Sequence, residues 1–166
     1  MILYIVRHAI AAPRGSAGVR DEERSLTPEG VRKMQQAAAG LNRLGVRPGV
    51  ILTSPLARAV ETAEILRRAL ESDAEIKIVP ALSPGAARDE VYEQIRRYRK
   101  LEQLTLVGHQ PSLGELAGAI AWGSADHFVE LKKGAACAIE IERVLPEPRG
   151  ALLFLLPPSV LRELAR

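Results

Sequence analysis

Cysteine is nearly absent from this sequence, since Cys137 is the only one among 166 residues. One cysteine excludes an intramolecular disulfide, and no cysteine–histidine spacing typical of a metal site occurs in the chain. Cys137 stands in the apolar run 135–139, where cysteine usually acts as a small hydrophobic residue. We therefore expect no disulfide, no metal and no cofactor.

Aromatic residues and long apolar runs are also scarce. Aromatics make up 4% of the chain and hydrophobic residues 47%, so the core must be built mainly from Leu, Ile, Val and Ala. The late apolar run 151–156 is far too short to cross a bilayer, and the N-terminus lacks the pattern of a signal peptide. These features predict a cytoplasmic protein without a membrane partner.

A strong charge imbalance is missing as well. The formal net charge of +3 is too small to indicate nucleic acid as a partner, and basic residues do not alternate with aromatic ones. Arginine outnumbers lysine, however, and the guanidinium fork binds phosphate oxygens in pairs. The composition therefore argues against nucleic acid and is compatible with a phosphorylated ligand.

Predicted strands and helices alternate along most of the chain. The predicted strands span residues 2–6, 50–52, 76–79, 104–107, 136–142 and 152–156. The predicted helices span residues 28–44, 55–70, 89–101, 111–122 and 159–164. This alternation predicts one α/β domain over residues 1–166, with three α/β/α layers and a mostly parallel central sheet. A loop rich in Gly, Pro and charge separates the first strand from the first helix, over residues 11–25.

Two helix starts carry the same signal, a hydroxyl residue followed by proline. Thr27-Pro28 and Ser54-Pro55 both place a capping side chain before a proline at the first helical position. We expect Thr27 and Ser54 to be N-caps. We also expect Trp122 to be a core residue rather than a platform for substrate.

Three predicted strands end in polar residues suited to an anion. Arg7-His8 follows the first strand, Arg58 lies in the first turn after the second, and His109 follows the fourth. Because the carboxyl ends of parallel strands meet at one edge of a sheet, these side chains should surround one cavity. Helix N-termini at the same edge add N–H donors and positive dipole ends, so the sequence predicts a phosphate site.

These motifs resemble the histidine phosphatase superfamily, also called phosphoglycerate mutase-like. Arg7-His8-Ala9 is similar to the family's R-H-G signature, and residues 54–63 match its S-P-x-x-R-A-x-x-T-A block. Residues 107–109 stand where the family has its second histidine, and residues 26–30 match its L-T-x-x-G helix opening. The short chain and the Gly-His-x-Pro form resemble the SixA branch of phosphohistidine phosphatases.

The resemblance implies a role for each of these side chains. His8 would be the nucleophile that forms a phosphohistidine intermediate, and it would have to be neutral. Arg7 and Arg58 would hold the phosphoryl oxygens, His109 would be a further donor that is cationic when phosphate is bound, and Arg24 would be an additional contact. We treat the remaining histidine, His127, as a surface or packing residue.

Two departures from the family pattern bear on the chemistry. Ala9 replaces the signature glycine, which a backbone with φ below zero tolerates. No carboxylate occurs in residues 80–85, and Gln110 follows His109 where larger members have an acid. Because general acid catalysis is typically worth about 10²–10⁴-fold, its absence favours phosphohistidine, whose imidazole leaves more easily than an alkoxide. Asp89 or Glu90 remains an alternative source of an acid.

The sequence therefore predicts a metal-independent phosphatase acting on phosphohistidine in a protein, such as a phosphohistidine carrier or a histidine-kinase-type domain. One alternative is a small-molecule phosphomonoesterase of the same superfamily, acting on a phosphorylated metabolite. A second is a non-catalytic phosphoprotein-binding module. The basic run 96–100 is interpreted as a solvated helix face or as a docking patch for an acidic partner.

Overall fold

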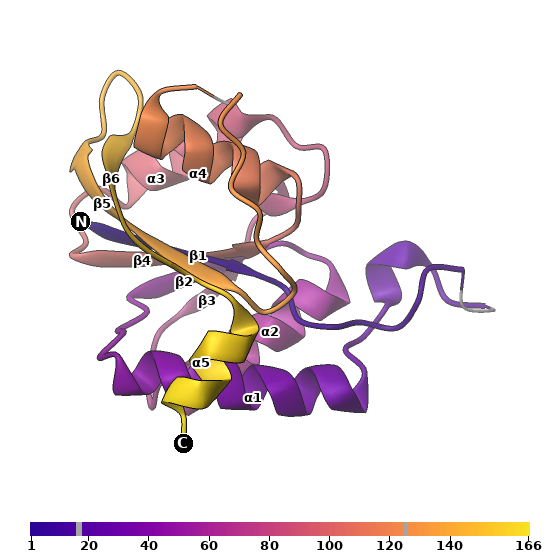
Figure 1. Cartoon of the computed structure of the whole chain (residues 1–166). Helices are drawn as coiled ribbons and strands as arrows, with labels where there is room; N and C mark the ends of the chain where they lie inside the picture. The colour runs from indigo at the N-terminus through magenta and orange to yellow at the C-terminus, as the bar shows by residue number, and fades with distance from the viewer. Residues whose placement is uncertain (16–17, 125) are drawn as a thin grey trace.

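One mixed sheet carries the fold of this protein, as the computed structural model of the chain shows (Figure 1). The structure describes residues 1–15, 18–124 and 126–166, so residues 16 and 17 of the predicted 11–25 loop lie outside it. The strands lie in the order β3-β2-β4-β1-β5-β6. Their bounds are Ile2–Arg7 (β1), Val50–Thr53 (β2), Ile76–Ile78 (β3), Gln103–Gly108 (β4), Ala136–Arg143 (β5) and Arg149–Leu156 (β6). The first four run parallel, whereas β5 pairs antiparallel with β1 and with β6.

Helices cover both faces of this sheet. One layer holds α1 (Pro28–Arg43), α2 (Ala57–Ala69) and α5 (Pro158–Leu164), and the opposite layer holds α3 (Arg88–Arg97) and α4 (Ser112–Trp122), as Figure 1 shows. Two short 3₁₀ turns, Asp21–Glu23 and Pro80–Leu82, interrupt the loops. The predicted α/β class with three layers and a mostly parallel sheet is confirmed.

The alternation of side chains along β1 explains why both faces need a helix layer. Leu3 and Ile5 belong to the core beneath α3 and α4, while Tyr4 and Val6 belong to the core beneath α1, α2 and α5. All four are buried. A parallel strand with apolar residues on both faces is stable only when helices cover both, so the site has to lie at the strand ends.

The two predicted hydroxyl caps have different outcomes. Thr27 accepts a hydrogen bond from Gly30 N at 3.0 Å and caps α1, as predicted. Ser54 does not cap α2, because that helix begins at Ala57 and its N-cap residue Leu56 provides no side-chain bond. The Ser54 hydroxyl accepts a bond from Leu56 N at 3.3 Å instead and takes part in the site described below.

The prediction that Trp122 is a core residue is wrong. Trp122 is the last residue of α4 and its surface is 53% exposed. The core-facing side of α4 is filled by Leu113, Leu116, Ala117 and Ile120. Another side faces the backbone of residues 127–129, which passes so close that a Cβ at Gly118 would collide with His127 O. Trp122 therefore stays outside, where its ring meets His127 edge-on at a centroid distance of 6.2 Å.

The single cysteine of the chain lies in the core. Cys137 is fully buried on β5, and burial raises the pKa of its thiol to about 12. This agrees with its interpretation as a small hydrophobic residue.

Within the described part of the chain, no helix is both long enough and apolar enough to cross a membrane.

Candidate active site

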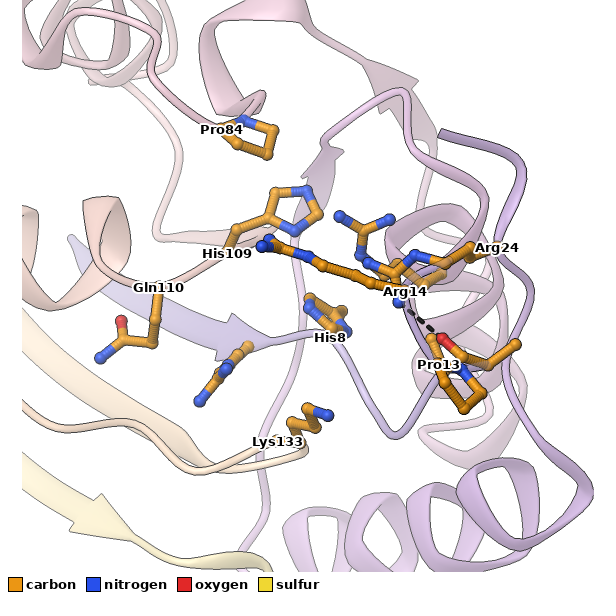
Figure 2. Close-up of a pocket in the computed structure, with 12 residues that line it drawn as sticks. His8, Pro13, Arg14, Arg24, Pro84, His109, Gln110 and Lys133 are labelled. Atoms are coloured by element: carbon orange, nitrogen blue, oxygen red, sulfur yellow. Dashed lines mark hydrogen bonds between the residues drawn. The ribbon is translucent and has the colours of Figure 1, made fainter. Parts of the chain in front are cut away.

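The carboxyl ends of β1, β2 and β4 meet as the sequence predicts. Backbone bonds hold them together: His8 N donates to Gly108 O at 3.0 Å, and Ser54 N donates to Val107 O at 3.0 Å. At this edge lies a cavity of about 290 Å³. Its lining consists of Arg7, His8, Ala11, Ala12, Pro13, Arg14, Arg24, Arg58, Pro84, His109, Gln110 and Lys133. In Figure 2, His8 and His109 lie between Arg14 and Arg24 on one side and Gln110 on the other.

His8 is held in one tautomer by its own turn. Its Nδ1 lies 2.7 Å from Ala9 O, and because a carbonyl can only accept, Nδ1 carries the hydrogen. Nε2 is then left with its lone pair. Burial, together with the positive charges of the cavity, lowers the pKa of His8 to about 3. The ring is therefore neutral at pH 7 and suited to nucleophilic attack through Nε2.

The turn after β1 is fastened to α2. Ala9 N donates to Thr62 Oγ1 at 3.1 Å, and that hydroxyl donates to Arg58 O at 2.6 Å. Among the described residues, Glu71 is the one non-glycine residue with a positive φ, so Ala9 has the negative φ that its side chain requires. The alanine in place of the family's glycine is thus accommodated without strain.

His109 faces His8 and contacts Ser54, which the sequence predicted to be a helix N-cap. The two ring centroids lie 5.0 Å apart, and His109 Nε2 lies 2.8 Å from Ser54 Oγ. Burial and the nearby Arg58 charge lower the pKa of His109 to about 4. It is neutral without a ligand, and its predicted cationic state with bound phosphate stays a prediction. Ser54 carried no signal for this contact beyond its place in the S-P-x-x-R block.

Arg58 and Arg24 share one carboxylate that the sequence analysis missed. Arg58 Nη2 lies 3.1 Å and Arg24 Nη2 2.8 Å from the Asp21 carboxylate, and Arg58 also donates to Asp21 O at 2.7 Å. Burial alone would raise the pKa of Asp21, but the two guanidinium groups outweigh it and hold that pKa below its ordinary value. In the sequence, Asp21 is indistinguishable from the acids at 22 and 23. The 3₁₀ turn at Asp21–Glu23 is what brings the Asp21 carboxylate, rather than its neighbours, to the two arginines.

Three more cations line the cavity from loops or strand ends. Arg7 donates through Nη1 to Leu131 O at 2.7 Å. Gly134 N donates to the carbonyls of Arg7 and His8, both at 3.2 Å, and so fixes its neighbour Lys133 close to His8 in the cavity lining. Lys133 and Arg14 were missed because each lies in an irregular segment whose path only the fold decides.

Unsatisfied hydrogen-bonding groups concentrate at this cavity. Of the four buried side-chain atoms without a partner in the described structure, three belong to residues that line it: Arg7 Nε, Arg58 Nε and Gln110 Oε1. A buried donor without a partner costs about 1–3 kcal/mol, more when charged, so such groups point to an absent ligand. The two guanidinium donors would be satisfied by acceptor oxygens, which a tetrahedral oxyanion supplies.

Carboxylates are missing from the lining, as far as the structure describes it. Asp89 and Glu90 lie exposed in the first turn of α3 and do not reach the cavity lining. Among the described residues, no group of three or more His, Cys, Asp or Glu could hold a metal ion. The arrangement can therefore hold an oxyanion against a neutral imidazole, with no acid beside it.

The sequence of this chain is similar to that of known proteins. The family model described as "Histidine phosphatase superfamily (branch 1)" matches residues 3–105. An uncharacterized protein of Picosynechococcus sp. is 41% identical over 135 residues, which cover 80% of this chain and 81% of that protein.

Solved structures establish the shared fold. The protein histidine phosphatase SixA complexed with tungstate superposes with a TM-score of 0.85 at 22% identity, covering 97% of this chain and 99% of that one. The α-ribazole phosphatase of Shigella flexneri gives a TM-score of 0.72 at 19% identity over 95% and 97% of the two chains.

Proposed function

Because the chain belongs to the histidine phosphatase superfamily, we propose that residues 1–166 act as one phosphatase that removes phosphate from phosphohistidine in proteins. The observation that carries this proposal is the neutral His8, whose Nε2 is free for attack inside a cationic cavity without a carboxylate. The same fold in SixA holds tungstate, which is also a tetrahedral oxyanion.

The proposed reaction has two displacements at phosphorus. In the first, the Nε2 lone pair of His8 attacks phosphorus, and the P–N bond to the substrate imidazole breaks. That imidazole carries a proton on its other ring nitrogen, so the electron pair of the broken bond leaves on a neutral imidazole. In the second, water attacks the phosphohistidine at His8, releasing inorganic phosphate and restoring the neutral ring. The protein contributes mainly position and charge in such transfers.

Arg7, Arg58, Arg24 and His109 supply the charge in this proposal. The unpartnered Nε atoms of Arg7 and Arg58 are donors for the phosphoryl oxygens. His109 is neutral when the cavity is empty, and an incoming dianion raises its pKa because it favours the protonated form. These donors are fixed before substrate arrives, which is what makes electrostatic stabilisation effective.

The missing acid sets the preferred leaving group. An alkoxide leaving from a sugar phosphate needs a proton in the transition state, and the cavity lining contains no carboxylic acid to give it. An imidazole is far less basic and leaves without that help. We therefore propose that the enzyme hydrolyses phosphoramidates and uses no metal ion. Hydrolysis of small phosphomonoesters, such as that of α-ribazole, is the second candidate function.

The test is a substrate panel of a phosphohistidine protein, phosphoramidate and several sugar phosphates. We expect turnover of the first two at least about 10²-fold above the sugar phosphates, the low end of the benefit of a general acid. Comparable turnover of both classes would instead support the phosphomonoesterase.

The His8→Ala variant is the control for the covalent step. Labelled substrate should give wild-type enzyme an acid-labile, alkali-stable phosphoenzyme, and the variant none. If the wild type neither labels nor turns over any donor while still binding phosphate, the chain is a binding module rather than an enzyme.

A further inference from the structure

A second cationic cavity lies on the other side of the His8 turn. It has a volume of about 120 Å³ and is lined by Ala9, Ile10, Gly30, Lys33, Met34, Lys133, Gly134, Pro158 and Arg162. Its three cations come from separate elements: Lys33 from α1, Arg162 from α5, and Lys133 from the segment before β5. Figure 1 shows α5 lying across α1 at this end of the sheet.

Most of the positive charge around this cavity is uncompensated. Lys33 pairs with Glu29 at 2.5 Å, one turn earlier on α1. Lys133 and Arg162 form no ion pair with any described residue, and no carboxylate of the described chain belongs to the lining. Two free cations and one paired cation around an otherwise apolar hollow favour a carboxylate carried on an aliphatic stem.

The second cavity borders the first. Lys133 lines both, and the Gly134 bonds to Arg7 O and His8 O fix it between them. Ala9, in the wall of the second cavity, follows the nucleophile His8, and consecutive Cα atoms are about 3.8 Å apart. One extended segment can therefore place a phosphorylated side chain in the first cavity and a nearby side chain in the second.

We propose that the Lys33/Lys133/Arg162 cavity is a subsite for a glutamate or aspartate side chain of the substrate protein, close to its phosphohistidine. This inference rests on the proposed function and names a class of substrate for it: segments in which a carboxylate accompanies the phosphorylated histidine. A sugar phosphate without a carboxylate has no group to place there, so the subsite favours acidic protein segments over such metabolites.

The experiment uses phosphohistidine peptides with one Glu placed one to four residues from the phosphohistidine, each matched by the same peptide with Gln. On wild-type enzyme, at least one Glu peptide should have a KM about tenfold below its Gln match, as two partly screened charge pairs allow. The double variant Lys33→Gln/Arg162→Gln should remove that difference and leave kcat unchanged. Phosphoramidate turnover should be the same in both enzymes.

A matched control removes two charges elsewhere. Arg32→Gln/Arg67→Gln lowers the net charge equally, and neither residue lines the cavity, so it should keep the Glu preference. The subsite is disproved if no Glu peptide is preferred while wild type turns over the peptides, or if the control loses the preference as fully. If wild type turns over phosphoramidate but no peptide, the proposed function itself fails, and the subsite with it.

Discussion

The parallel half of the sheet (β1 to β4) and its antiparallel half (β5 and β6) differ sharply in chemistry. All buried polar or charged side chains of the described chain lie on or near the parallel half: His8, Arg24, Thr53, Ser54, Arg58, Thr62, Thr105 and His109. The buried positions of β5 are Ala, Cys and Ile. Both halves share one hydrogen-bonded sheet, so strand direction rather than burial separates them.

Strand direction explains the difference. The parallel strands β1, β2 and β4 bring their carboxyl ends to one edge, where the following loops and helix starts can supply side chains and N–H groups. Because β5 runs the opposite way, its carboxyl end lies at the far edge. It reaches the cavity only through the segment before it, by way of Lys133 and Gly134.

The strongest way to test this division is to remove one arginine from each half. Arg58→Gln should lower kcat/KM by about 10²–10³-fold, since it removes a fixed donor from the oxyanion. Arg149→Gln on β6 removes an exposed surface pair with Glu147 and should change it less than twofold. Steady-state kinetics with phosphoramidate measures both, and equal losses would contradict the assignment of the chemistry to the parallel half.

The pH dependence of sulfate binding tests the charge state of the cavity. His109 has its pKa lowered to about 4 in the empty protein, and a bound dianion should raise it. Sulfate then takes up a proton on binding, so its affinity should increase as pH falls from 8 to 5, by up to about tenfold per unit. Competitive inhibition measures this affinity.

Two variants decide which histidine is responsible for that pH dependence. His109→Gln should flatten most of the profile, because no proton can then be taken up at this position. His127→Gln, in the exposed segment that follows α4, should leave it unchanged. A flat wild-type profile would show that His109 stays neutral with the anion bound.

Ser54→Ala tests a positioning residue at the end of β2. Losing the contact to His109 Nε2 should lower kcat about tenfold, the value of a lost hydrogen bond to a group that becomes charged. A positioning role predicts a further sign, namely that the pH dependence of sulfate binding shifts along with kcat. A loss of stability alone, with an unchanged pH profile, would make Ser54 merely structural.

The smallest effect is expected in the antiparallel half. Cys137→Ala should cost about 1 kcal/mol of unfolding free energy, because it removes one buried methyl-sized group. Activity should stay within about twofold of wild type, a change within 0.5 kcal/mol. Urea unfolding and phosphoramidate turnover measure the two quantities. A large loss of activity would show that β5 contributes to the reaction, and would contradict the division between the parallel and antiparallel halves.

Some features were predictable because local sequence determines them. Thr27-Pro28 predicts the start of α1 correctly, since the cap bond spans only three residues. Ser54-Pro55 carries the same local signal, yet Ser54 points at His109 because the buried ring competes for the same hydroxyl. The exposure of Trp122 was not predicted for a similar reason, since Trp122 lies one turn after Gly118, on the side of α4 that faces residues 127–129 rather than the core.

By itself, the sequence determined the order of the elements, the parallel half of the sheet, and the strand ends that carry Arg7, His8, Arg58 and His109. These follow from hydrophobic periodicity and from the rule that parallel strands end at one edge. Tertiary structure alone decided that Asp21 is the carboxylate that holds Arg24 and Arg58, and that Lys133 lies in the same cavity lining as His8. Both lie in irregular segments, whose positions depend on long-range backbone contacts that no local pattern records.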